Sequence, residues 1–217
     1  MNKTSPQLPK EFTLTNDFSS YAEEFLISEL PITNMKSTGS VVQDEGFYSI
    51  EINKSIFDNC TLHACNFRKA SFIDVVFQSC DLSNTEFQNA YFERCRFISC
   101  KCLGVNMSDT VIKKTAFEET NLQYSYFDRS RMTDVVFEEI DFTEASMVEA
   151  KLKKFQPNKS KFLKNNFHRT LLATVDFTNS ELAAPIVSSP PVELKGAIID
   201  MFQAANLIGL WGIIVKL

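Results

Sequence analysis

The chain has 217 residues, of which 44% are hydrophobic, and a formal net charge of −5 at neutral pH. This length and apolar content allow one well-buried domain or two very small ones. The mildly acidic balance disfavours direct nucleic-acid binding by the chain as a whole. The amino terminus lacks the basic segment and apolar run of a signal peptide, and no apolar stretch reaches transmembrane length. We therefore expect a cytoplasmic protein without a membrane segment.

Residues 1–46 show no convincing repeat. The run from Asp17 to Leu26 favours a short helix, with Asp17 or Ser19 as its N-cap. A stack of repeats cannot leave its terminal apolar layer in water. We therefore expect residues 1–46 to cap the first coil of the repeat that follows.

From Phe47 onward the sequence repeats every five residues, with Phe or Leu at most centres and a small or β-branched residue two positions earlier. The chain contains twenty Phe, and fifteen of them lie at repeat centres. Neither a 3.6-residue helix nor a period-2 strand has this spacing, so the chain must bend once every five residues, and four bends close a square. The pattern predicts an all-β, quadrilateral coil over residues 47–188. Its clearest centres are Phe57, Leu62, Phe67, Phe72, Phe77, Leu82, Phe87, Phe92 and Phe97.

A square coil places residues twenty apart directly above one another. One such column reads Phe57, Phe77, Phe97, Phe117 and Phe137. Coils in parallel β-type pairing lie ~4.8 Å apart, so these rings are expected to stack. The phase is unbroken from 57 to 182, which argues against an inserted loop. Pro157 is the one centre that departs from the pattern, and we expect a local kink or bulge there, with Phe155 filling the space.

The sequence contains few residues in patterns typical of a catalytic site. His63 and His168, the only two histidines, occupy outward positions of distant coils, and the six glycines form no phosphate-binding loop. Cys60, Cys80 and Cys100 would stack in one column, but inward positions favour small apolar packing over a metal site. We expect a protein that is not an enzyme and that has no cofactor and no metal site.

Acidic and basic residues are segregated along the second half of the chain. Nine acids and four bases lie between residues 113 and 149, and seven bases without an acid lie between residues 151 and 175. The twenty-residue rule places Glu118 and Glu119 over Glu138 and Glu139. The basic stretch contacts DNA held beside a partner or balances the neighbouring acidic coil, and we favour balance. The candidate acidic face comprises Glu118, Glu119, Asp128, Glu138, Glu139, Asp141 and Glu144.

The carboxy-terminal region, residues 189–217, begins at a Ser-Ser-Pro-Pro sequence that breaks the coil. We expect a helix over residues 192–208, ended by Gly209, and a short terminal strand over residues 210–215. Elements this apolar must cover the last coil or a second subunit. The candidate dimer-interface residues are Ile198, Met201, Phe202, Ala205, Ile208 and Trp211.

The repeat resembles the pentapeptide-repeat family. The segments Cys-Asn-Phe-Arg-Lys at 65–69, Ala-Ser-Phe-Ile-Asp at 70–74 and Cys-Asp-Leu-Ser-Asn at 80–84 carry the resemblance, which extends over about two thirds of the chain. Members of this family fold as right-handed quadrilateral β-helices. The resemblance is specific for fold and weaker for function, because some members have no known role.

The length, the nearly uninterrupted repeat and the apolar carboxy terminus are similar to the quinolone-resistance branch of the family, the Qnr and MfpA type proteins. That resemblance implies a homodimer joined through the carboxy terminus that binds DNA gyrase and topoisomerase IV. It also implies that the acidic face acts as a DNA mimic and protects these enzymes from quinolones, a form of antibiotic resistance. Some Qnr members carry loops that contribute to protection, and this chain resembles the loopless type. The alternative is a non-enzymatic scaffold that binds another protein.

Overall fold

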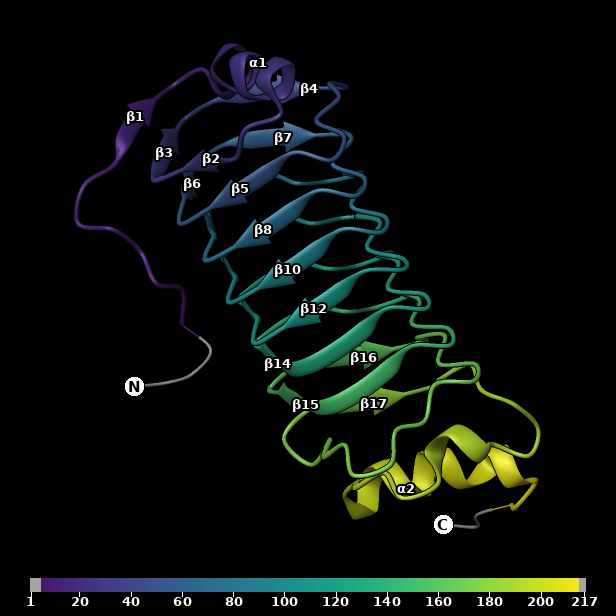
Figure 1. Cartoon of the computed structure of the whole chain (residues 1–217). Coiled ribbons are helices and arrows are strands. Elements are labelled where there is room, and N and C mark those ends of the chain that lie inside the picture. Colours follow the sequence, from purple (N-terminus) through teal and green to yellow (C-terminus); the bar gives the residue numbers. More distant parts are fainter. Residues whose placement is uncertain (1–4, 215–217) are drawn as a thin grey trace.

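The chain forms a quadrilateral β-helix with a helix at each end, as a computed structural model that describes residues 5–214 shows (Figure 1). The predicted all-β coil is therefore confirmed. The strands are β1 (Thr13–Thr15), β2 (Ile32–Thr33), β3 (Met35–Thr38), β4 (Val41–Gln43), β5 (Glu51–Asn53), β6 (Ile56–Asp58), β7 (Thr61–His63), β8 (Ser71–Ile73), β9 (Val76–Gln78), β10 (Tyr91–Glu93), β11 (Arg96–Ile98), β12 (Val111–Lys113), β13 (Ala116–Glu118), β14 (Arg131–Glu138), β15 (Lys151–Asn158), β16 (Lys161–Leu163) and β17 (Glu181–Ala183). The helical elements are α1 (Phe18–Ser28), α2 (Met201–Leu207) and the 3₁₀ turns η1 (Val192–Leu194) and η2 (Ile208–Trp211).

Each coil has four sides of five residues. Side 1 carries β2, β5, β8, β10 and β12, and side 2 carries β3, β6, β9, β11 and β13. Side 3 carries β4, β7, β16 and β17, and side 4 is built from turns joined by isolated bridges such as Asn106 to Tyr126. The longer strands β14 and β15 run across sides 1 and 2.

The sides differ because some positions before the centre carry Asn or Asp. Asn106 and Asn121, for example, accept a hydrogen bond on the side-chain oxygen from the backbone N–H two residues later. This Asx geometry makes a tight turn and competes with an extended strand. On sides 1 and 2 the same position holds residues such as Val111 and Arg96, and strands form there.

The pairing register is twenty residues throughout the regular part of the coil. It runs from Ile32, which pairs with Ile52, to Asn166, which pairs with Ile186. The unbroken register contains no inserted loop, as the phase of the sequence predicted. The stacked rings are present as well, because Phe97 and Phe117 have centroids 4.5 Å apart and planes 5° apart.

Parallel pairing begins earlier than residue 47, where we expected the coil to start. β2, β3 and β4 already pair with β5, β6 and β7. The early coil is hard to recognise in the sequence because Ser37 stands at a centre. Phe18 of α1 compensates, since its ring lies 4.9 Å from the ring of Phe57 and is fully buried. The helix expected near Asp17 is confirmed as α1, with the Asp17 carboxylate accepting from the Ser20 N–H.

At Pro157 the expected kink or bulge is wrong. Phe137 pairs with Pro157 in the same register as its neighbours. The missing amide is tolerated because the proline nitrogen lies on the strand edge that pairs with no later strand among residues 5–214. Phe155 does fill space in the core, since it is 6% exposed and its ring packs edge-on against Phe137 at 4.9 Å.

The carboxy-terminal prediction needs a correction. The expected helix over residues 192–208 is reduced to η1 and the seven residues of α2, followed by η2, which continues through Gly209. No strand forms within residues 210–214, and residue 215 lies outside the described residues. The chain between η1 and α2 is extended because it pairs with the last coil, where the Phe177 N–H donates to the Ile198 carbonyl at 2.9 Å.

Candidate protein-binding surfaces

The predicted acidic face has its centre on side 2. Glu118 and Glu138 are neighbours in the β13–β14 register, so the predicted stacking is confirmed. Both have cationic partners. A nitrogen of Arg96 lies 2.5 Å from Glu118, and Lys159 Nζ lies 3.4 Å from Glu138 and 2.9 Å from Glu139. Hydrogen bonding to Glu139 and then Glu138 raises the pKa of Lys159 above its ordinary value.

The remaining predicted acids are distributed around the coil. Glu119 accepts a hydrogen bond from Ser99 Oγ at 2.9 Å, and Glu144 pairs with Lys164 at 3.2 Å. Asp141 on side 3 accepts from the Thr143 N–H. Asp128 follows the side 4 centre and accepts from the Val148 N–H at 2.8 Å. Since side 4 lies opposite side 2 in a four-sided coil, Asp128 does not join the surface formed by Glu118 and Glu138.

The basic coil balances the acidic coil at a spacing of twenty residues. Besides the pairs of Lys159 and Lys164, Lys154 lies 3.2 Å from Asp134, and Arg169 lies 2.8 Å from Glu149. Our preferred interpretation of the basic stretch is therefore supported. Exposed ion pairs of this kind contribute little to stability and are screened by salt. They do remove the continuous negative charge that a DNA-like surface requires.

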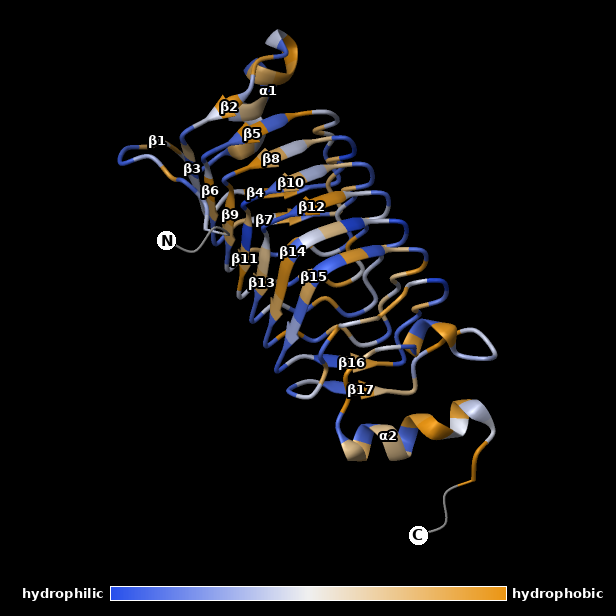
Figure 2. Ribbon diagram, turned by 60° about the horizontal axis from the view of Figure 1, so that its bottom comes forward, coloured by the Kyte–Doolittle hydropathy of each residue, from blue (hydrophilic) through white to orange (hydrophobic). Residues whose placement is uncertain are grey.

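The apolar carboxy terminus remains uncovered over most of its predicted interface. Met201 and Phe202 are 75% and 72% exposed, Ile198 and Trp211 are about half exposed, Ala205 is exposed, and Ile208 is half-buried. In Figure 2 parts of the α2 ribbon carry the colour of hydrophobic residues. α2 turns Gln203 and Leu207 toward the last coil, and the Gln203 amide nitrogen donates to the Phe177 carbonyl at 3.1 Å. Asp200 forms a capping box with Gln203 that fixes the start of the helix. The burial of Gln203 therefore leaves the large apolar side chains facing outward.

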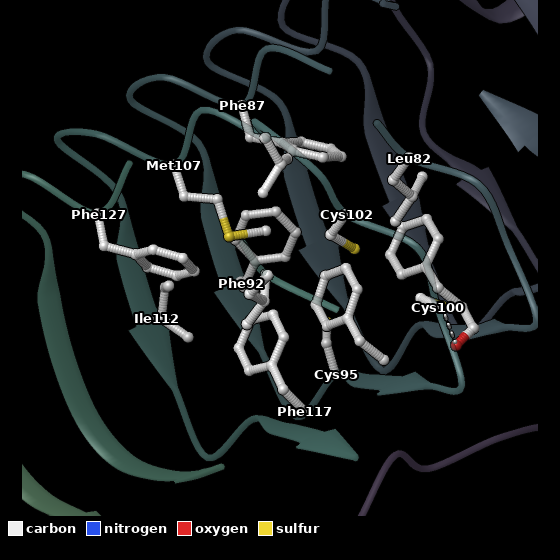
Figure 3. Packing of buried hydrophobic residues seen from close by; sticks show 14 of the residues in the cluster. Leu82, Phe87, Phe92, Cys95, Cys100, Cys102, Met107, Ile112, Phe117 and Phe127 are labelled. Carbon is white, nitrogen blue, oxygen red and sulfur yellow. Dashed lines mark hydrogen bonds between the residues drawn. The ribbon is translucent and has the colours of Figure 1, made fainter. Parts of the chain in front are cut away.

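The cysteine column is part of the core. Cys95, Cys100 and Cys102 lie among Phe rings in Figure 3, and all six thiols are free and buried. Burial raises the pKa of Cys65 to about 11 and that of Cys95 to about 12, so both are protonated at neutral pH. Cys100 Sγ donates a hydrogen bond to the Phe77 carbonyl oxygen at 3.4 Å.

Across residues 5–214 no group of three or more His, Cys, Asp or Glu side chains is arranged to hold a metal ion. His63 lies 3.3 Å from an Asn84 nitrogen and His168 lies 3.4 Å from Ser188 Oγ, on different coils. In the same part of the chain, no helix is both long enough and apolar enough to cross a membrane.

Two buried carboxylates were missed from the sequence. Asp74 is 2% exposed; its carboxylate forms an ion pair with Arg94 and accepts a hydrogen bond from the Gln7 N–H. Glu193 is fully buried and accepts from Ser188 Oγ and the Arg169 N–H. Burial alone would raise the pKa of each, but the hydrogen bonds from these donors lower both below the ordinary value. Asp74 and Arg94 are twenty residues apart, which was a readable signal, whereas Glu193 lies beyond the periodic region.

Comparison with known proteins identifies the repeat. Residues 70–139 match the family model described as pentapeptide repeat region. The structure resembles the full-length form of QnrB1, a plasmid-mediated fluoroquinolone resistance protein, with 22% sequence identity and a TM-score of 0.51 over 84% of this chain and 92% of that one. A trypsin-treated form of QnrB1 gives the same identity and TM-score over 85% and 92%. No curated protein matches the sequence. At this identity the likeness concerns the fold.

Proposed function

Because residues 70–139 belong to the pentapeptide-repeat family and the same coil continues on both sides, we propose that this chain binds type II topoisomerases, DNA gyrase and topoisomerase IV, and protects them from quinolones. The observation that carries the proposal is the shared fold with QnrB1 along most of both chains. The proposal places the protein in the cytoplasm, without direct nucleic-acid binding and without a catalytic role.

The proposed contact surface is the part of the acidic face that the coil brings together. It consists of Glu118, Glu119, Glu138 and Glu139 on side 2 and its corner, continued by Asp141 and Glu144. These side chains are outside the core, so a partner can reach them. On binding, these carboxylates must give up their lysine and arginine partners and pair with groups of the topoisomerase instead. Exposed pairs exchange at little cost, and high salt is expected to weaken the complex.

The proposed assembly is a homodimer through the carboxy terminus. Met201, Phe202 and Trp211 are exposed apolar side chains of the kind that a second subunit covers. M201E/F202E is expected to be monomeric in sedimentation experiments, whereas I27E/L30E, which changes two exposed apolar residues at the other end, is expected to leave the assembly unchanged. A wild-type protein that sediments as a monomer would remove this part of the proposal.

A gyrase supercoiling assay with and without ciprofloxacin tests the function. The protein is expected to restore supercoiling in the presence of the drug or to inhibit it without the drug. E118Q/E119Q/E138Q/E139Q should abolish the effect, while E23Q/E24Q/E29Q/E51Q removes the same charge from exposed positions at the amino-terminal end and should preserve it. Absence of both effects at micromolar protein would exclude the function, and activity in the first variant would exclude the surface.

The ion pairs favour a second candidate, a scaffold that binds a different protein. A surface whose acids are matched by Lys159, Lys164 and Arg96 imitates DNA poorly. A scaffold would leave gyrase and topoisomerase IV unaffected in the same assay.

A further inference from the structure

The strand β15 has a free edge. On one side it pairs with β14 along its whole length, from Arg131–Lys151 to Glu138–Asn158. On the other side it pairs with no strand in the described part of the chain. Two coils earlier, the Lys114 N–H donates to the Thr133 carbonyl at 2.9 Å, and the Arg131 N–H donates to the Thr110 carbonyl at 2.8 Å.

The equivalent bonds beyond β15 are absent among residues 5–214. The Lys154 N–H does not reach the Ala173 carbonyl, and the Leu171 N–H does not reach the Ala150 carbonyl. The last coil instead pairs with the segment after η1, where the Thr174 N–H donates to the Gly196 carbonyl at 2.8 Å. Pairing with the preceding coil resumes at Lys159, whose N–H donates to the Asn179 carbonyl at 3.0 Å.

The gap has a cause in the sequence. Phe155 occupies a position that holds a small or β-branched residue in every other coil except the first, which has Met35, and Pro157 has no N–H to donate. The Phe155 ring is 6% exposed and packs edge-on against Phe137 and Phe162 in the core. Along sides 1 and 2 the two coils therefore lack the backbone hydrogen bonds that join the earlier coils, while Phe155 and Leu172 stay buried.

A groove of about 780 Å³ lies at the side 1 end of this gap. Leu152, half-buried, and Leu171, 64% exposed, form its apolar part. Four of its charged residues neutralise one another, because Asp109 pairs with Arg129 at 2.8 Å and Glu149 pairs with Arg169 at 2.8 Å.

Two cations in the groove stay uncompensated. Arg131 and Lys151 are adjacent in the β14–β15 register and are exposed, and neither has a carboxylate within ion-pair distance in the region that the structure describes. Lys153, next along β15, is exposed and also has no such partner. The groove therefore combines unpaired backbone donors, two leucine side chains and net positive charge.

We propose that this groove binds an extended acidic segment of a partner protein by strand addition along the β15 edge. Carbonyl oxygens of the segment accept hydrogen bonds from the N–H groups of Leu152 and Lys154. Its carboxylates lie against Arg131 and Lys151, and an apolar side chain contacts Leu152 and Leu171. A basic segment is excluded by repulsion. This site lies apart from side 2 and does not depend on the proposed topoisomerase function.

Fluorescence polarisation with a labelled seven-residue peptide of alternating Glu and Val tests the proposal. The peptide is expected to bind the wild type, and R131E/K151E is expected to bind at least roughly tenfold more weakly. K161E/K195E reverses two exposed charges outside the groove and should bind like the wild type. In hydrogen exchange, the peptide should slow the Leu152 and Lys154 amides.

Three results would overturn the proposal. The first is equal binding of a peptide with alternate N-methylated amides, because that peptide retains the charge but cannot pair as a strand. The second is tighter binding of duplex DNA or inorganic phosphate, lost in R131E/K151E, which would make the groove a phosphate site. The third is no peptide binding to the wild type, which would mean that the lysines protect the edge from pairing.

Discussion

The middle coils and the last coil are built from the same pentads but satisfy their backbones differently. Between β8 and β14 every coil pairs with the coils before and after it at a spacing of twenty residues. The last coil pairs instead with a segment twenty-two residues later, as the bridge from Asp176 to Ile198 shows. Unpaired backbone N–H groups and unpaired charges are therefore concentrated near the last coil, where the twenty-residue spacing ends. The middle coils offer a partner only their outward side chains.

The largest expected contrast concerns aromatic side chains in the two regions. Phe97 is fully buried and stacked between Phe77 and Phe117. Phe97→Ala should lower the free energy of unfolding by about 3–5 kcal/mol, because it removes buried area and leaves a cavity. Phe202→Ala, at a 72% exposed position, should leave the urea midpoint unchanged at concentrations where the protein is monomeric. Equal destabilisation by both variants would mean that α2 is part of the core.

Amide exchange compares the two regions without a mutation. Lys114 and Lys154 occupy the same position two coils apart, but the Lys114 amide is bonded and the Lys154 amide is free. The Lys154 amide should exchange at least about a hundredfold faster, because its exchange requires no opening of the coil. Hydrogen exchange resolved by mass spectrometry or NMR measures the ratio. Similar protection at the two positions would show that the gap beyond β15 closes in solution.

A smaller effect is expected at Asp74, whose carboxylate connects the amino-terminal segment to side 1. Arg94 Nε lies 2.7 Å from Asp74 Oδ1, and the Gln7 N–H donates to the same carboxylate at 2.9 Å. Asp74→Asn should cost about 2 kcal/mol at pH 7, since the buried carboxylate gives up its charge-assisted hydrogen bonds with the half-buried Arg94. The folded pKa of Asp74 is lowered, so its stabilisation is present above the unfolded pKa and is lost as pH falls through the folded value.

Urea unfolding at pH 7 and at pH 3 checks both parts of this prediction. The difference between wild type and Asp74→Asn should shrink at pH 3, because this pH lies below the ordinary aspartate pKa of ~3.9 and part of the stabilisation by the carboxylate is lost. A difference that stays constant would mean that the amide changes packing and that charge plays no part.

The smallest effect is expected at the ion pairs between the acidic and basic coils. Glu139→Gln removes the 2.9 Å contact with Lys159, but both side chains are exposed and water replaces the contact. The urea midpoint should not move measurably, and added salt should not change that result. A clear loss of stability would show that the ion pairs between the acidic and basic coils help to stabilise the fold.

Much of the fold could be read from the chain. An inward residue every fifth position predicts the bend, the twenty-residue register and the burial of the cysteines, because each coil contacts only its neighbours and repeats their geometry. The same rule predicts the stacking of Glu118 on Glu138. The Asp74–Arg94 pair has the same spacing, but we did not predict it. The lysines that neutralise the acidic face, as the sequence led us to favour, follow this spacing too.

The tertiary structure decided what happens at the two ends. Phe18 of α1, which lies outside the repeat, supplies a core side chain at the amino-terminal end. At the other end Glu193, in the 3₁₀ turn η1, accepts hydrogen bonds from the Arg169 and Ser188 amides. A terminal coil has only one neighbour, so the rest of its surface is covered by a segment with no period to follow. The sequence by itself therefore determined the repeating coil, and only contacts between distant, non-repeating residues decided its caps, its open strand edge and the exposed face of α2.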